Sequence, residues 1–119
     1  MSFDEGLVDW VTESLEPIGI VTMRKMMGGA TLYCDGTIFA LISDSDLYFK
    51  SDAVNAAEFE EAGLGKFEFT GKDGKTGTMN YCAAPLDAYD DPEAMRQWAR
   101  LGVEAGLRAP KKNPRKKKR

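Results

Sequence analysis

The sequence contains no histidine. Ser–His and Cys–His nucleophilic arrangements, and metal sites built on imidazole, therefore cannot be assembled from this chain. This absence excludes most hydrolase and metalloenzyme functions. We expect a protein that is not an enzyme, with no catalytic residues, no metal and no cofactor.

Cysteine is nearly absent, since Cys34 and Cys82 are the only two and lie 48 positions apart. Neither has a CxxC partner, which excludes a zinc site or a thioredoxin-like motif by spacing. We favour two buried thiols in a reducing cytoplasm, and a disulfide stays open if their strands are neighbours. A catalytic role for either cysteine would require an exposed thiol of lowered pKa.

Long hydrophobic runs are also missing. No segment approaches the roughly 20 apolar residues that span a bilayer, and the N-terminus lacks the pattern of a signal peptide. We therefore expect a cytoplasmic protein without a membrane segment. A chain of 119 residues with 43% hydrophobic residues can bury one core as a single domain.

Acidic residues are absent from the last ten positions, which hold seven of the 16 Lys and Arg. Residues 1–109 then carry 9 basic and 19 acidic side chains, a net charge of -10. We predict a folded domain over residues 1–109 and a disordered basic tail over 110–119. The tail residues that could contact nucleic acid or another polyanion are Lys111, Lys112, Arg115, Lys116, Lys117, Lys118 and Arg119.

Three segments have helical patterns. Residues 3–16 predict an amphipathic helix capped by Ser2 or Asp4, and a short helix capped by Ser51 or Asp52 precedes Gly63. In the last helix Asp91 would be the cap and Pro92 the first helical residue. Its predicted core side comprises Ala94, Met95, Trp98, Ala99, Leu101, Ala105 and Leu107. Gly102 and Gly106 lie on one face, where they favour close packing against a sheet.

Between the helices, short apolar runs alternate with turn residues. Residues 20–26, 31–34, 37–42 and 47–50 predict an antiparallel meander, in which Asp35-Gly36 forms a tight hairpin. Residues 66–70 and 78–82 predict a second hairpin. The fold class is therefore α+β, with a helix, three or four strands, a short helix, a β-hairpin and a C-terminal helix, and with the helices on one side of the sheet.

Three local patterns have a chemical interpretation that we consider weaker than the structural one. Asp87, Asp90 and Asp91 could bind a cation, but acids before a helix are usually caps. Gly28-Gly29 precedes a strand and not a helix, which favours a turn or bulge over a phosphate loop.

The third pattern is a set of aromatic residues on strands that could stack on single-stranded nucleic acid, namely Tyr33, Tyr48, Phe67, Phe69 and Tyr81. Such a platform needs basic neighbours. The neighbours in the sequence have the wrong sign, as Glu58, Glu60, Glu61 and Glu68 show. We therefore predict that these rings pack in the core.

Arg24 and Lys25 are adjacent on a predicted strand, so alternation directs one to each face of the sheet. They are our candidates for an interaction surface.

The stretch RKMMGGATLYCDGTIFALI, residues 24–42, resembles the N-terminal domain of the TfoX/Sxy family, which takes its name from a bacterial regulator of competence. Weaker similarities follow in the family's order at 47–50, Phe59, Gly63, Phe67, Phe69, 79–81, Pro85 and 98–99. The resemblance covers about residues 5–107. Met27 stands where the family usually has an aromatic residue.

The resemblance implies a standalone N-terminal module without the family's second, helical domain, and it supplies no catalytic residues. It therefore predicts a non-enzymatic regulatory or protein-interaction domain, linked to transcriptional or competence regulation, with a protein partner. The alternative is an accessory protein that binds nucleic acid weakly through its basic tail. A homodimer formed at a strand edge, such as residues 47–50 or 78–82, is a further hypothesis.

Overall fold

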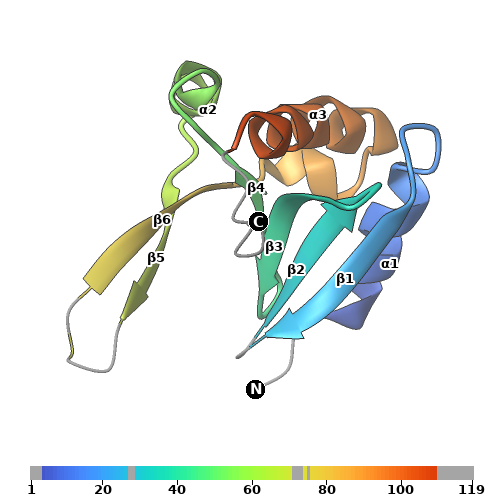
Figure 1. Ribbon diagram of the computed structural model, residues 1–119, viewed down its shortest axis with the longest axis horizontal. Coiled ribbons are helices and arrows are strands. Elements are labelled where there is room, and N and C mark those ends of the chain that lie inside the picture. The colour runs from blue at the N-terminus through green and yellow to red at the C-terminus, as the bar shows by residue number, and fades with distance from the viewer. Residues whose placement is uncertain (1–3, 27–28, 71–73, 75, 110–119) are drawn as a thin grey trace, which may run out of the picture.

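The computed structural model describes residues 4–26, 29–70, 74 and 76–109 (Figure 1). Its helices are α1 (Glu5–Ser14), α2 (Ala56–Glu61), the 3₁₀ helix η1 (Leu86–Tyr89) and α3 (Pro92–Arg108). Its strands are β1 (Val21–Met26), β2 (Gly29–Cys34), β3 (Thr37–Ser43), β4 (Asp46–Lys50), β5 (Lys66–Thr70) and β6 (Thr76–Ala83). The predicted α+β class and element order are confirmed. The basic tail and Gly28 lie outside the described residues.

The six strands form one antiparallel sheet in the order β1-β2-β3-β4-β6-β5. Figure 1 shows α1 and α3 behind the sheet, while the β5–β6 hairpin projects away as an arm. β4 pairs with β6 and not with β5, so β4 and β6 both lie inside the sheet. The edges predicted for a homodimer, residues 47–50 and 78–82, are therefore not edges, and β1 and β5 take those positions.

The main core lies between the sheet and the helices. It contains side chains that are at least nine-tenths buried: Leu7, Val11, Leu15, Leu32, Cys34, Phe39, Ala40, Ile42, Leu47, Phe49, Phe59, Cys82, Ala84, Ala88, Met95 and Ala99. A bulge between β2 and β3 shifts the register from Leu32–Ala40 to Tyr33–Ile38. The bulge lets the neighbours Phe39 and Ala40 both enter the core, which strict alternation would forbid.

Local rules predicted several turns and caps correctly. Asp35 and Gly36 have φ values of 50° and 85°, as a tight Asp-Gly hairpin requires. The Asp4 side chain accepts a hydrogen bond from the Leu7 amide at 3.2 Å, so Asp4 caps α1. Asp91 caps α3 by accepting from the Glu93 amide at 3.0 Å, with Pro92 in the first turn.

Two predictions about the helices were wrong. Leu107 is 66% exposed because it lies about 200° around α3 from the buried Ala105. Neither Ser51 nor Asp52 caps α2, which begins at Ala56. The Asp52 side chain instead accepts from the amides of Val54 and Asn55, so it closes a turn ahead of the helix. The 3₁₀ helix η1 was not predicted.

Arg108 fixes the end of α3 to the loop after β4. Its Nε donates to Asp52 Oδ2 at 2.8 Å and its second nitrogen donates to Oδ1 at 3.0 Å. The hydrogen bonds from Arg108 are the main cause that lowers the pKa of Asp52 from its ordinary value of 3.8.

We expect Asp52→Asn to lower the melting temperature at neutral pH and to have less effect in acid. A carboxylate whose pKa is lowered by folding contributes stability above its unfolded pKa, and this contribution disappears as the pH falls through the folded pKa. Thermal unfolding of both proteins from about pH 7 to pH 3 measures the difference. A deficit that stays constant over this range would show that the ion pair does not stabilise α3.

Candidate functional site

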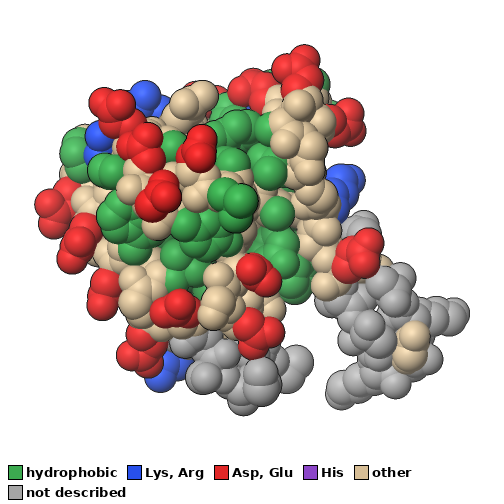
Figure 2. Space-filling view, turned by 180° about the vertical axis from the view of Figure 1, so that it is seen from behind, with side chains coloured by type: hydrophobic (Ala, Val, Ile, Leu, Met, Phe, Trp, Pro, Cys, Tyr) green, Lys and Arg blue, Asp and Glu red, His purple; other side chains and the backbone are tan. Residues whose placement is uncertain are grey.

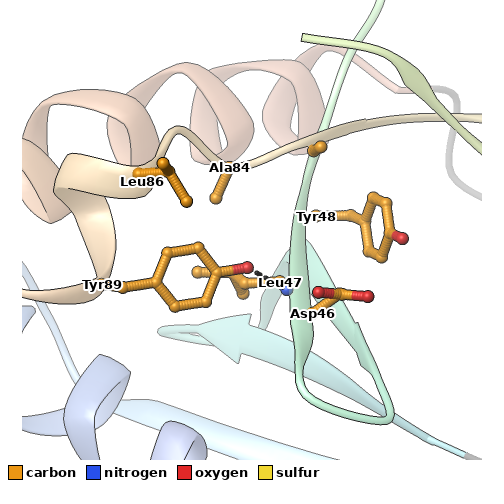
Figure 3. Close-up of a pocket in the computed structure, with 7 residues that line it drawn as sticks. Asp46, Leu47, Tyr48, Ala84, Leu86 and Tyr89 are labelled. Carbon is orange, nitrogen blue, oxygen red and sulfur yellow. Dashed lines mark hydrogen bonds between the residues drawn. The ribbon is translucent and has the colours of Figure 1, made fainter.

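The candidate site is a notch at the point where β6 leaves β4. The two strands pair from Lys50–Tyr81 to Tyr48–Ala83, and the Ala84 amide donates to the Leu47 carbonyl at 2.9 Å. Pro85 then directs the chain into η1, so the start of β4 pairs with β3 on one side and has no strand on the other. A cavity of about 410 Å³ opens there (Figure 3), and its lining residues are Asp46, Leu47, Tyr48, Ala83, Ala84, Leu86 and Tyr89.

Tyr89 occupies the position that a strand carbonyl would otherwise take. Its hydroxyl accepts a hydrogen bond from the Leu47 amide at 2.8 Å, drawn as the dashed line in Figure 3. Burial is the main cause that raises the pKa of Tyr89; the hydrogen bond from the Leu47 amide lowers it, and the charge of Asp46 raises it. A phenol keeps its proton at neutral pH, so the Tyr89 hydroxyl can also donate a hydrogen bond to a ligand in the notch.

The notch has an apolar wall and an acidic rim. In Figure 3, Leu86, Ala84 and the Tyr89 ring lie on one side of β4, and Asp46 and Tyr48 lie on the other. Leu86 is 85% exposed, which makes it the most exposed of the large apolar side chains identified on the surface. Burial is the main cause that raises the pKa of Tyr48, followed by the negative charge of Asp46.

The surface on the helix-covered side also combines apolar with acidic side chains. Figure 2 shows that side as an apolar area surrounded by Asp and Glu side chains. The Trp10 indole donates to the Ala88 carbonyl at 2.8 Å, so α1 and η1 meet there. The exposed acids on the elements of this side include Asp9, Glu13, Asp87, Asp90, Asp91 and Glu93.

The structure places the predicted interaction residues away from the notch. Arg24 pairs with Thr31 and Lys25 pairs with Ala30, so they lie on opposite faces of β1, as alternation predicts. Both side chains are exposed. The seven predicted tail contacts lie outside the described residues.

In the acidic cluster, the Asp91 side chain caps α3, and Asp87 and Asp90 are exposed on the surface. Within the described residues, no three Cys, Asp or Glu side chains gather in a way that could hold a metal ion.

The two cysteines are free and buried, at 3% and 4% exposure. Burial raises the pKa of the Cys34 thiol, and the neighbouring Asp35 raises it further. These surroundings are the opposite of those that activate a nucleophilic cysteine. The strands that carry Cys34 and Cys82, β2 and β6, are separated by β3 and β4, so the condition for a disulfide is not met.

The sequence did not indicate the notch. Its residues come from β4, β6 and η1, and they meet only because β6 crosses to the side of β4. The one local signal is Leu86, a lone large apolar residue between Pro85 and Asp87.

A scan against protein-family models matches the TfoX N-terminal domain over residues 13–106. The chain belongs to the TfoX N-terminal domain family. The match runs from α1 into the last turns of α3, and it includes every residue of the notch in this TfoX N-terminal domain. A search of the curated proteins found no match. In the described part of this TfoX N-terminal domain, no helix is long and apolar enough to cross a membrane.

Proposed function

We propose that this TfoX N-terminal domain is a non-enzymatic, cytoplasmic interaction module that regulates a partner protein by binding it at the notch. The observation that carries the proposal is Leu86, an 85% exposed side chain on the wall of a cavity of about 410 Å³. An exposed apolar residue beside a cavity is typical of a binding site for a partner.

The chemistry of the notch favours one kind of partner segment. An apolar side chain of that segment would fill the space between Leu86 and the Tyr89 ring. A neighbouring Lys or Arg would pair with Asp46, and the acids of the helix-covered side would attract further cations. The expected ligand is therefore a peptide segment in which an apolar anchor lies beside basic residues.

A function by binding, without catalysis, also agrees with the reactive side chains that the sequence provides. Histidine is absent from the sequence, and burial raises the pKa of Cys34. Competence or transcriptional regulation, which the family's name suggests, is a role that such a module could serve by engaging a regulatory protein.

The proposal is tested by selecting random short peptides from a display library on the full chain. We expect the selected peptides to combine an apolar residue with Lys or Arg. Leu86→Lys and Asp46→Lys should each weaken the best peptide by about tenfold or more, as measured by calorimetry.

The matched control is Leu107→Lys, which changes an exposed leucine on α3 outside the notch and should leave the affinity unchanged. Selected peptides that lack apolar residues, or that bind the Leu86→Lys variant as they bind the wild type, would contradict the proposal.

A further inference from the structure

Strand β1 forms one edge of the sheet, since it pairs with β2 on one side and with no described strand on the other. Figure 1 shows it at the margin of the sheet, in front of α1. The Ile20 carbonyl accepts a hydrogen bond from the Asp35 amide at 2.8 Å. This bond fixes the pattern of the ladder, because the bonded positions of an antiparallel pair recur at every second residue.

Three residues of β1 direct their backbone groups away from the sheet. Steps of two residues from Ile20 assign the even-numbered residues to the ladder with β2, and leave Val21, Met23 and Lys25 facing the free edge. In the described part of the chain, no loop or helix forms a backbone hydrogen bond with these three residues. Unpaired amide and carbonyl groups in such a row are the template for an added strand.

The same edge is basic at one end. Arg24 and Lys25 are both exposed and lie on opposite faces of β1. The one salt bridge found among the described residues joins Arg108 to Asp52, so these two cations have no carboxylate partner there. Two adjacent cations without such a partner, in a region with a net charge of -10, favour an acidic ligand at this edge.

The other end of the edge is apolar. Ile20 is 73% exposed immediately before β1. Val21 and Met23 are half-buried and pack against the core from the edge of the sheet. A strand with apolar side chains beside these residues would remove their remaining surface from water.

The size and charge of the edge favour a short segment of another protein over a second copy of this chain. Stable interfaces between folded proteins use about 20 to 30 residues on each side. Strand β1 has six residues. A second copy would also bring the cations of two chains into one seam, where like charges weaken association.

We propose that β1 binds an extended, acidic segment of a partner protein by strand addition. In an antiparallel arrangement, two consecutive acids of the segment lie beside Lys25 and Arg24. Apolar residues further along the segment cover Met23, Val21 and Ile20. Backbone hydrogen bonds hold the segment and the two acids select it. The site shares no residue with the notch, so it does not depend on the proposed function.

The test is the fluorescence anisotropy of the labelled peptide Ser-Glu-Glu-Val-Thr-Val-Leu-Ser, titrated with the full chain at about 0.15 M salt. At this ionic strength, screening over about 8 Å weakens the long-range repulsion from the acidic domain. Arg24→Glu and Lys25→Glu should each weaken binding by about fivefold or more. The matched control is Lys66→Glu, the same charge change on the exposed edge strand β5, which should bind within about twofold of the wild type.

The backbone contribution has its own test. Met23→Pro removes an outward amide and should weaken the peptide by about tenfold or more, whereas proline is tolerated at an edge position whose amide faces solvent. Circular dichroism melts check that the variant is folded. N-methylation of alternate peptide amides tests the same bonds without changing the protein. One alternating set should abolish binding and the other should preserve it, because only one set faces β1.

Three outcomes would overturn the proposal. In the first, Arg24→Glu and Lys25→Glu bind the peptide as tightly as Lys66→Glu does. In the second, Leu86→Lys abolishes binding, which would place the peptide in the notch. In the third, light scattering finds a dimer of the wild type that Met23→Pro separates into monomers, so a second copy covers the edge.

Discussion

Replacing Gly106 by alanine should lower the free energy of unfolding by about 3 kcal/mol, although alanine is the better helix former. A Cβ at Gly106 would overlap the Ile38 carbonyl oxygen and lie 2.7 Å from Thr37 Cγ2. At Gly102 a Cβ would lie 2.5 Å from the Phe39 carbonyl oxygen, and we expect a similar loss. Both contacts are with the β3 backbone, which cannot move without disturbing its paired strands.

Helix propensity alone predicts the opposite sign, a gain of about 1 kcal/mol for each alanine. Chemical denaturation of the two variants decides between propensity and packing. Gly65→Ala is the control, since a Cβ there would meet nothing within 4 Å, and its stability should stay close to that of the wild type. Unchanged or raised stability in Gly102→Ala and Gly106→Ala would show that α3 does not rest directly on β3.

Asn55→Leu should cost about 3 kcal/mol, because it leaves buried polar groups without partners. Asn55 is 2% exposed, and its Oδ1 accepts from the Asp52 amide at 2.8 Å. Its Nδ2 donates to the Leu101 carbonyl at 2.9 Å and to the Lys50 carbonyl at 3.5 Å. One side chain thus joins the end of β4, the turn before α2 and the middle of α3.

The isosteric variant Asn55→Asp identifies the cause of that loss. A carboxylate would face two carbonyl oxygens, so its folded-state pKa should rise above its unfolded value. The variant should therefore regain stability as the pH falls and the carboxyl becomes protonated, measured as unfolding free energy at about pH 7 and pH 4. Equal losses at both pH values would contradict the role of the Nδ2 hydrogen bonds.

The elements that the sequence predicted well are those controlled by neighbouring residues. Asp35-Gly36 encodes its own hairpin because both residues tolerate positive φ. Asp91-Pro92 encodes the start of α3 for equally local reasons, since one supplies the cap and the other lacks an amide hydrogen. The spacing of Gly102 and Gly106 correctly predicted close packing on the sheet.

The features that the sequence did not predict depend on the order of the strands. The pairing of β5 with β6 was predicted correctly, but no local pattern specifies that β6 lies next to β4. The notch exists only because of that order, since Tyr89 returns to bond Leu47 across 42 positions of sequence. The position of Glu58, Glu60 and Glu61 was misjudged as well, because they lie on α2, which packs on α3 through the Phe59 and Trp98 rings.

The two faces give the domain an uneven charge distribution that a net value of -10 for residues 1–109 conceals. The helix-covered side combines an apolar area with carboxylates, as Figure 2 shows. On the opposite face of the sheet, the described strand positions carry the cations Arg24 and Lys50 and the carboxylate Asp46. Tyr33, Tyr48 and Phe67 lie there half-buried, and not in the core as predicted.

The most direct test of the central claim, that the notch binds a partner segment, is a ¹H–¹⁵N correlation spectrum of the chain titrated with the best selected peptide. We predict that the largest shift changes fall on the amides of Asp46, Leu47, Leu86 and Tyr89, with the edge strand β1 unaffected. Changes centred on Arg24 and Thr31, or spread evenly over the domain, would contradict the account.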